Sequence, residues 1–290
     1  MDKLDIAIER IKEASKMSEF YYKKPLMITY SGGKDSDCIL ELAKISGIKF
    51  EVCHSHTTAD APETVNYVRQ RFYELELQGI KCTIEMPYYK GQRISMWSLI
   101  PIKKMPPTRL MRYCCEVLKE TSGKNRAIVT GVRWDESTKR KSRGIFEDIN
   151  RNSEKKIVLN NDNDDKRKLF ERCELQAKTV CNPIVDWLTS DVWDFLNYRK
   201  CPCNPLYKCG FDRVGCVGCP MANKKRYTEF QMWPKYKTLY IHAFDRMIAA
   251  RLADGKPTEW QNGYEVFQWW MQEDYRQLKF DFMEEGGLIC

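Results

Sequence analysis

Short apolar runs alternate along the first half of the chain with segments whose apolar residues recur at helical spacing. The apolar runs, each a predicted buried strand, lie at residues 25–30, 48–53, 80–86 and 127–130. Helical spacing begins in the first twenty residues and returns between the runs. Strands that alternate with helices are typical of a mostly parallel sheet covered on both faces. We therefore expect an α/β fold with a doubly wound sheet.

The pattern changes in the second half of the chain. Residues 147–172 are polar and highly charged without a clear period, which predicts a mobile excursion from the sheet. Order resumes at Asn182, and a helix through Leu196 is expected, with Thr189 or Ser190 as its cap. The sheet domain is thus expected to continue past the excursion.

The last third is rich first in cysteine and then in aromatic residues. A cysteine-rich loop occupies residues 201–220, and from about Tyr227 the chain has helical character with many aromatic side chains. We expect two domains, residues 1–222 with the cysteine-rich loop and a helical C-terminal subdomain at residues 223–290. Basic residues lie among the aromatic ones of this subdomain. They suit either a polyanionic partner or the solvated face of a packed helical cap.

Composition limits the classes of protein to which the chain can belong. It has 290 residues, of which 43% are hydrophobic and 30% charged, as in ordinary globular proteins. No apolar run reaches the roughly 18 residues of a membrane span, and the first residues lack the apolar core of a signal peptide. We expect a cytoplasmic protein without a membrane partner. Its formal charge of +8 favours phosphate-rich partners.

Thirteen cysteines add a second chemistry. The cytosol keeps thiols reduced, so a framework of disulfides is not expected there. Closely spaced cysteines in that compartment bind a metal or carry out redox chemistry instead. The candidates are Cys114, Cys115, Cys201, Cys203, Cys209, Cys216 and Cys219.

A glycine-containing turn joins the first predicted strand to the next helix. Residues 31–36 of this turn read Ser-Gly-Gly-Lys-Asp-Ser. Glycines let a backbone approach a ligand closely, and the helix points its free N–H groups and positive dipole end at an anion. Lys34 adds a positive charge, and Ser31 and Ser36 add hydroxyl donors. The turn is therefore predicted to bind phosphate, while Asp35 either meets a magnesium ion or turns away to hold the loop.

The spacing of this turn resembles the PP-loop of ATP pyrophosphatases, which split ATP between the α and β phosphates, and differs from the Walker loop. Residues 56–64 and 131–137 resemble two further loops of the phosphoadenylyl-sulfate (PAPS) reductase superfamily. The resemblance implies an adenine nucleotide alpha hydrolase-like fold whose loops converge at the carboxyl ends of the strands. The nucleotide-binding residues that it implies are Ser31, Gly32, Gly33, Lys34, Asp35, Ser36, Thr57, Asp60, Gly131, Arg133 and Arg140. The implied catalytic residues are Lys34, Asp35 and Arg133, with Arg133 and Arg140 able to clamp phosphate or sulfate oxygens.

The cysteines extend the resemblance. A Cys-Cys step at Cys114 and a distant Cys-x-x-Cys at Cys216, preceded by Asn204-Pro205-Leu206, are similar to the cluster-binding pattern of iron–sulfur adenylyl-sulfate reductases. This implies a 4Fe–4S cluster bound by Cys114, Cys115, Cys216 and Cys219. Two alternatives are a structural zinc on the same four thiolates and a local set formed by Cys203, Cys209, Cys216 and Cys219.

Three functions are consistent with these features. The intact Gly-Gly-Lys-Asp pattern resembles enzymes that use ATP and Mg²⁺, cleave the α–β bond and support sulfur transfer to a nucleic acid, as in tRNA thiolation or DNA phosphorothioation. A sulfonucleotide reductase that produces sulfite is the alternative, although its usual loop and C-terminal tail differ from residues 31–36 and 286–290 of this chain. A non-catalytic nucleotide or redox sensor is the third. The implied partners are an adenine nucleotide, a nucleic-acid acceptor and a sulfur donor such as a cysteine desulfurase or thioredoxin-like protein.

Overall fold

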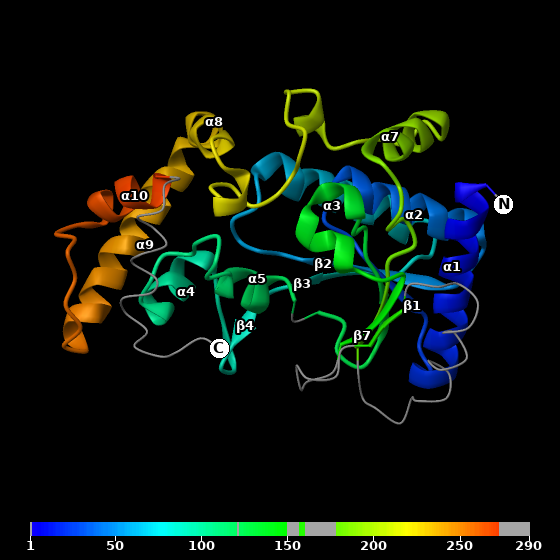
Figure 1. The fold of residues 1–290 in the computed structure, drawn as a ribbon, viewed down its shortest axis with the longest axis horizontal. Helices are drawn as coiled ribbons and strands as arrows, with labels where there is room; N and C mark the ends of the chain where they lie inside the picture. The colour runs from blue at the N-terminus through cyan, green and yellow to red at the C-terminus, as the bar shows by residue number, and fades with distance from the viewer. Residues whose placement is uncertain (1, 121, 150–156, 160–177, 273–290) are drawn as a thin grey trace. The chain divides into compact units, whose positions relative to one another are not determined.

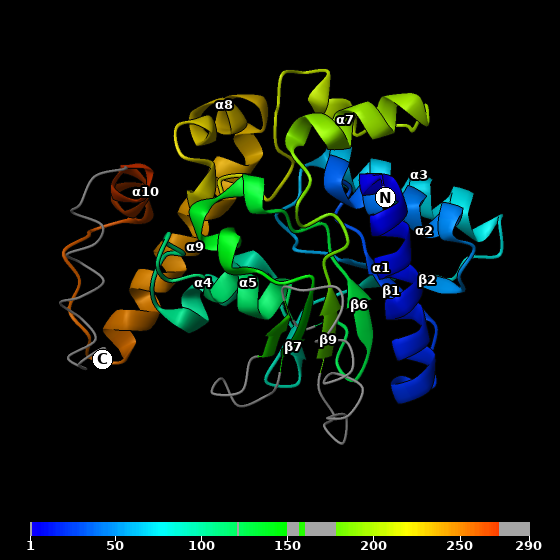
Figure 2. The same cartoon turned by 45° about the vertical axis from the view of Figure 1, so that its right-hand side comes forward.

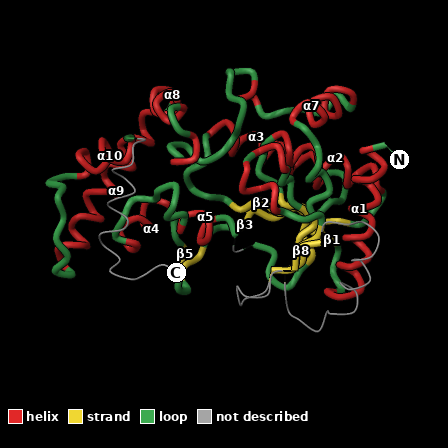
Figure 3. Tube along the Cα trace, in the orientation of Figure 1, coloured by secondary structure: helices red, strands yellow, loops and turns green. Residues whose placement is uncertain are grey.

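The computed structural model describes residues 2–120, 122–149, 157–159 and 178–272. The chain divides into two compact units. Figure 1 labels the helices and strands, and Figure 3 colours the trace by secondary structure. Unit 1 comprises residues 1–55, 62–85 and 122–214. Unit 2 comprises residues 56–61, 86–121 and 215–290. The expected domains at residues 1–222 and 223–290 stay a prediction.

Unit 1 is built on a seven-stranded sheet in the order β3-β2-β1-β6-β9-β7-β8. The strands are β1 (Leu26–Thr29), β2 (Phe50–Ser55), β3 (Cys82–Glu85), β6 (Ala127–Val129), β7 (Phe146–Ile149), β8 (Ile157–Leu159) and β9 (Lys178–Cys181). The five strands from β3 to β9 in this order pair in parallel, whereas β7 and β8 are antiparallel to their neighbours. The predicted α/β fold with a mostly parallel sheet is confirmed.

Three of these strands were not expected from the sequence. β7 and β8 lie in or beside the predicted excursion at residues 147–172, so that prediction is wrong for residues 147–149 and 157–159. The remainder of the excursion lies outside the described residues. β9 is the third unexpected strand, and it sits between β6 and β7. The sheet is thus wider than the apolar runs indicate.

Helices flank this sheet. They are α1 (Lys3–Met17), its π-helical extension (Ser18–Tyr22), α2 (Lys34–Ser46), α3 (Pro62–Glu76) and α7 (Thr189–Tyr198), with 3-10 turns at Trp134–Glu136, Thr138–Ser142 and Pro205–Tyr207. Figure 2 shows α1 running beside β1 and β6. The core beneath the helices includes Ile28, Leu40, Val52 and Val129, all fully buried. Burial of these side chains fixes β1 and α2, and therefore the turn between them.

The cap of α7 differs from the expected one. Leu188 occupies the N-cap position, and its backbone N–H donates to Asp191 Oδ2 at 2.7 Å. The prediction that Thr189 or Ser190 caps this helix is wrong. The Thr189 hydroxyl instead donates to Asp135 Oδ2 at 2.8 Å, which ties α7 to the loop after β6.

A carboxyl group is buried beneath the first turn of α2. Asp37 is 1% exposed, and its Oδ1 accepts a hydrogen bond from the Tyr30 hydroxyl at 2.5 Å. The Tyr67 hydroxyl lies 3.1 Å from Asp37 and 2.7 Å from the Pro202 carbonyl oxygen. Because a carbonyl oxygen can only accept, the Tyr67 hydroxyl donates its shorter hydrogen bond to Pro202, which leaves Tyr30 as the stronger donor to Asp37. Burial raises the pKa of Asp37 to about 7.

The buried carboxyl predicts how stability depends on pH. The folded protein retains the Asp37 proton from its ordinary pKa of 3.8 up to about 7, while the unfolded chain has lost it. The free energy of unfolding should therefore fall as pH rises across this window, by on the order of 2–4 kcal/mol in total. Asp37→Asn should flatten that part of the profile in urea unfolding at pH 5 and pH 7.5. An equal slope in both proteins would contradict a protonated Asp37.

Unit 2 is mainly helical. Its elements are the hairpin strands β4 (Tyr88–Tyr89) and β5 (Gln92–Arg93), α4 (Met96–Lys103), α5 (Tyr113–Leu118), a 3-10 turn (Pro220–Ala222), α8 (Lys225–Met232), α9 (Pro234–Ala253) and α10 (Gly263–Met271). The aromatic residues expected here form its core: Tyr240 and Trp270 are buried with ring centroids 4.6 Å apart. Arg226 is also buried and donates to the carbonyl oxygens of Trp270 and Met271. These side chains hold α8, α9 and α10 together.

Candidate functional site

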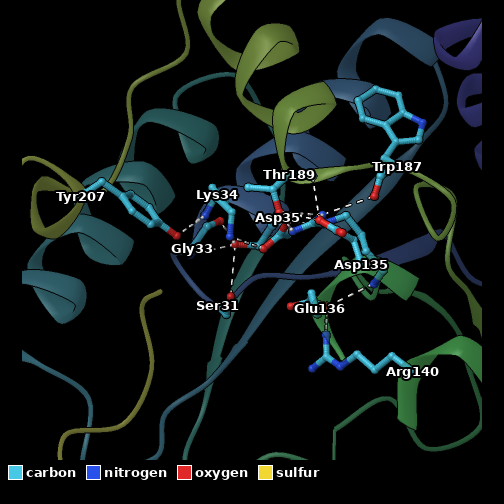
Figure 4. Close-up of polar contacts among 12 residues, drawn as sticks. Ser31, Gly33, Lys34, Asp35, Asp135, Glu136, Arg140, Trp187, Thr189 and Tyr207 are labelled. Carbon is cyan, nitrogen blue, oxygen red and sulfur yellow. Dashed lines mark hydrogen bonds and ion pairs between the residues drawn. The ribbon is translucent and has the colours of Figure 1, made fainter. Parts of the chain in front are cut away.

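The phosphate loop, residues 31–36, lies between β1 and α2 in unit 1 (Figure 4). Gly33 is the N-cap of α2. The Ser36 hydroxyl donates to the Gly33 carbonyl oxygen at 2.7 Å and accepts from the Gly33 N–H at 3.1 Å, and the Ser31 hydroxyl donates to Ser36 Oγ at 3.3 Å. Both serines therefore shape the loop.

The start of α2 presents backbone donors. In the described part of the chain, the N–H groups of Asp35 and Ser36 have no hydrogen-bond partner. Such first-turn N–H groups, at the positive end of the helix dipole, form an anion site. The Lys34 side chain adds a positive charge, although it is only 7% exposed. The arrangement fits one or more phosphate groups.

One first-turn donor is already occupied. The Lys34 N–H donates to the Tyr207 hydroxyl oxygen at 2.8 Å, and this ring makes an edge contact with Trp193 at 5.0 Å. A phosphate that uses this N–H must displace the Tyr207 oxygen. Tyr207→Phe should therefore tighten the binding of a nucleotide about 3- to 10-fold, because no competing acceptor remains. Weaker binding by calorimetry would instead identify the Tyr207 hydroxyl as a donor to the nucleotide.

Asp35 is turned toward two cations of the protein. Its Oδ1 accepts from Arg133 Nε at 2.7 Å, and its Oδ2 lies 3.2 Å from Lys34 Nζ. Gly131 allows this approach, since a Cβ atom there would stand 3.0 Å from the Asp35 backbone. Of the two expected roles of Asp35, holding the loop is the one that these contacts support. The neutralised carboxylate does not repel a phosphate at the N-terminus of α2.

The Arg133 side chain is buried and hydrogen-bonded to other residues of the protein. Its side chain is 1% exposed, and its Nη1 lies 3.3 Å from the Trp187 carbonyl oxygen and 3.2 Å from Thr189 Oγ1. Nη1 also pairs with Asp135 at 3.4 Å. With these partners the guanidinium positions Asp35, so direct contact with phosphate stays a prediction. Arg140, which is partly exposed, pairs with Glu136 on the same loop.

Sequence reasoning missed two residues of this site. Asn204 Nδ2 donates to the Gly32 carbonyl oxygen at 3.0 Å and to Thr64 Oγ1 at 3.1 Å. Tyr207 holds the Lys34 N–H as described above. Both belong to the Asn-Pro-Leu-Tyr segment, which the sequence singled out only for its place before the cysteines. That segment therefore contacts the phosphate loop of unit 1 directly.

The four predicted metal ligands all belong to unit 2. Cys114 and Cys115 lie in α5, while Cys216 and Cys219 flank a turn in which Gly218 has a φ of +75°. A Cβ atom on Gly218 would stand 2.5 Å from the Phe230 ring, so glycine is required on two grounds. The hydrogen bond to Cys115 and burial raise the pKa of Cys114, and the charges of Cys216 and Cys219 raise it further.

Charges around the thiols favour thiolates at part of this centre. The hydrogen bond from Cys114 and the guanidinium of Arg112, whose Nη2 lies 3.3 Å from Cys115 Sγ, hold the pKa of Cys115 down at about 5. Burial raises the pKa of Cys216 to about 11, against the opposing charge of Lys119. The Cys216 charge in turn raises the pKa of Lys119. Four thiols with nearby cations are a donor set suited to a metal centre of net negative charge.

Thr57 and Asp60 accompany the cysteines in unit 2. Cys216 Sγ lies 3.4 Å from Thr57 Oγ1, and Cys216 forms a β-bridge with Asp60. The Asp60 carboxylate accepts from the Thr57 N–H at 2.9 Å. Their expected contact with the nucleotide stays a prediction.

The remaining thiols are divided between the units. Cys201, Cys203 and Cys209 belong to unit 1, so the alternative local ligand set needs residues from both units. Cys201 and Cys203 line a cavity of about 730 Å³ together with Trp193 and Tyr207. Burial raises the pKa of Cys201 to about 11. Burial likewise raises the pKa of the Cys203 thiol.

Known proteins resemble much of this chain. An uncharacterized protein of Methanocaldococcus jannaschii is 27% identical over 225 residues, or 75% of this chain and 42% of that protein. The chain spans less than half the length of the first two curated relatives it matches. An adenosine 5'-phosphosulfate reductase of Bacillus thuringiensis is 24% identical over 211 residues, covering 69% of this chain and 75% of the relative.

Solved structures are more distant in sequence. The phosphoadenylyl-sulfate reductase of Candida auris is 15% identical with a TM-score of 0.45, covering 73% of this chain and 93% of that one.

Within the described ranges, no helix combines the length and apolarity that a bilayer crossing requires. The model of the phosphoadenosine phosphosulfate reductase domain matches residues 25–222, which include the phosphate loop and all four cysteines of the centre. The chain belongs to the phosphoadenosine phosphosulfate reductase domain family.

Proposed function

We propose that this protein binds ATP, cleaves it between the α and β phosphates and supports sulfur transfer. One observation carries the proposal: the free N–H groups of Asp35 and Ser36 lie beside Lys34, and the Asp35 carboxylate is neutralised by its own ion pairs. A polyphosphate gains several donors there without meeting an unpaired negative charge. The intact Gly-Gly-Lys-Asp sequence agrees with this role.

The chemistry is activation of a leaving group. An acceptor oxygen attacks the α phosphorus, the bond from that phosphorus to the bridging oxygen of the β phosphate breaks, and pyrophosphate leaves with the electron pair. Lys34 and the first-turn N–H groups of α2 stabilise the charge that develops on pyrophosphate. Bound Mg²⁺ would supply further neutralisation of the phosphates. A sulfur nucleophile then displaces AMP from the adenylated acceptor.

Cys114, Cys115, Cys216 and Cys219 are proposed to hold a 4Fe–4S cluster. The cysteine pattern resembles that of iron–sulfur adenylyl-sulfate reductases, which supports this cluster, and zinc on the same four thiolates stays the alternative. Such a cluster, with each iron bound by one of the four thiolates, would supply a one-electron redox centre.

The proposed acceptor is a nucleic acid. The formal charge of +8 on the chain supports a polyanionic acceptor. A sulfur-donor protein, such as a cysteine desulfurase or a thioredoxin-like protein, completes the proposed set of partners. We place the reaction in the cytoplasm, where thiols stay reduced.

A sulfonucleotide reductase is the second candidate, and the family and the named reductase relatives support it. Anaerobic incubation of the purified protein separates the two functions. One reaction contains ATP and Mg²⁺, and the other contains adenylyl sulfate or its 3′-phosphate with a thiol reductant. Pyrophosphate and AMP are the expected products of the first reaction, in which water takes the place of the acceptor oxygen. Sulfite from the second without pyrophosphate from the first would establish the reductase, and no product from either would favour a nucleotide or redox sensor.

A further inference from the structure

A stretch of unit 2 carries positive charge without any carboxylate. Residues 86–115 include six Lys and Arg residues and no Asp or Glu. They form the β4–β5 hairpin, α4 and the start of α5. Ordinary surfaces mix both signs of charge, so a 30-residue segment of one sign is a feature that calls for an anionic partner.

The cations and rings of this segment are contiguous. Lys90 Nζ lies 5.7 Å from the centre of the Tyr89 ring, and Lys103 Nζ lies 4.8 Å from the same ring. Lys103 Nζ is also 5.8 Å from the Tyr113 ring. The hairpin, the end of α4 and the start of α5 therefore form one surface. Figure 1 shows β4 beside α5.

The same surface reaches the cysteine centre. Tyr113 directly precedes Cys114, and Arg112 Nη2 lies 3.3 Å from Cys115 Sγ. We call this surface the basic strip; its members are Tyr88, Tyr89, Lys90, Arg93, Lys103, Arg109 and Arg112. Four of its five cations form no ion pair with a residue in the described ranges, and the fifth, Arg112, faces Cys115 Sγ. Tyr88 is 60% exposed and Lys90, Arg93, Arg109 and Arg112 are exposed.

The helices α8 and α9 are a poorer candidate for the same role. The sequence suggested them as a basic platform, but Arg226 is buried against α10. Acidic residues lie between the remaining cations: Glu229 is on α8 and Asp245 is on α9. The seven Lys and Arg residues at 224–253 thus include two buried ones, Arg226 and Arg251, and are interrupted by acidic residues, whereas residues 86–115 contain no acidic residue.

We propose that the basic strip binds single-stranded nucleic acid and leads it to the cysteine centre. Unpaired cations neutralise backbone phosphates, and the exposed Tyr88 ring offers a face on which a base can stack. An acidic protein would pair with the cations of the basic strip but would not need an exposed aromatic ring. A nucleic acid uses both the cations and the Tyr88 ring, so these features favour it as the occupant. The inference rests on the proposed function only for what happens to the nucleic acid after it has bound. Binding of the nucleic acid to the basic strip does not require ATP.

Anisotropy of a fluorescent 15-nucleotide single strand, as DNA and as RNA, tests the strip with the full-length protein in 50–200 mM KCl. Affinity should fall with salt, with a log–log slope of about −0.7 for each phosphate contacted. Lys90→Glu with Arg93→Glu should weaken binding at least about 10-fold, and Tyr88→Ala at least about 5-fold. The matched control, Lys224→Glu with Lys225→Glu at the start of α8, makes the same change in charge and should alter affinity less than about 2-fold.

Equal losses of affinity in the two double variants would overturn the assignment of the binding site to the basic strip. Binding would then depend only on the total charge of the protein. Unchanged binding by Tyr88→Ala, or equal competition by polyglutamate, would also overturn it by showing that bases are not recognised. Circular dichroism and the affinity for ATP should be unchanged in the strip variants, which excludes unfolding. Binding that maps to the strip without pyrophosphate release from ATP would refute the proposed function alone, and the reverse result would refute the strip alone.

Discussion

Lys34→Ala should lower the rate of pyrophosphate release from ATP by about 10²- to 10³-fold, the usual effect of removing one preorganised donor from a developing anion. Lys34 is the cation that follows the N-cap of α2, and it is largely buried with its Nζ 3.2 Å from Asp35. Alanine leaves the backbone N–H groups in place, so nucleotide binding should weaken less than turnover. Quenched-flow measurement of pyrophosphate under saturating ATP and Mg²⁺ gives the rate.

Lys44→Ala is the matched control for this change. Lys44 lies on the same helix, and its Nζ pairs with Glu41 at 3.1 Å. Its removal takes away the same charge from the last turn of α2 and should change turnover less than about 2-fold. Both variants should retain the iron content of the wild-type protein, since the four cysteines lie in unit 2. Turnover that survives in Lys34→Ala would remove the phosphate loop from the reaction.

The part of the fold that surrounds the phosphate loop could be predicted from the sequence because it obeys simple periodicities. β1 is a run of apolar residues, and α2 follows a glycine turn. β9 could not be recognised, because it begins with Lys178 and Thr179. Lys178 donates to the Ser122 carbonyl oxygen at 2.7 Å, and Thr179 lies 2.8 Å from the Tyr22 hydroxyl. Partners far along the chain satisfy these polar groups, and a local pattern carries no information about them.

β7 could not be recognised from the sequence for the same reason. Glu147 reads as a surface residue of a charged segment, yet it is completely buried. Its Oε1 accepts from Arg143 Nε at 2.7 Å and from the Gly144 N–H at 2.9 Å. A carboxylate with two such donors can occupy a sheet interior. The sequence pattern therefore favoured an excursion where the structure forms a strand.

Gly131 lies against Asp35 of the phosphate loop, while the roles of the site residues stay predictions. The loop residues and Gly131 meet as expected, because parallel strands bring their carboxyl ends to one edge of a sheet. Arg133 was expected to face phosphate, but α7 covers it through Thr189. Asn204 and Tyr207 contact the loop from 172 and 173 residues away along the chain. Such contacts depend on tertiary packing, which motif spacing does not specify.

Cys216→Ala should abolish the cluster. Wild-type protein purified without oxygen should be brown and contain about four irons and four sulfides per chain, and the variant should lose nearly all of them, because three remaining thiolates leave one iron without its protein ligand. Cys216 is also nearly buried, so no nearby water readily replaces it. Iron and sulfide assays together with visible absorption measure the loss. Pyrophosphate release from ATP with water as the acceptor reports whether unit 1 is intact in the variant.

Cys203→Ala distinguishes the two possible ligand sets. Cys203 belongs to unit 1, where it lines the cavity beside Tyr207, and its removal should leave the iron content unchanged. A cluster that survives Cys114→Ala but not Cys203→Ala would establish the local set of Cys203, Cys209, Cys216 and Cys219 and overturn the one proposed here. Colourless protein with one zinc per chain would overturn the iron–sulfur assignment while leaving the four ligands in place. Because Cys216 belongs to both sets and also suits zinc, only the paired variants and the metal analysis together identify the centre.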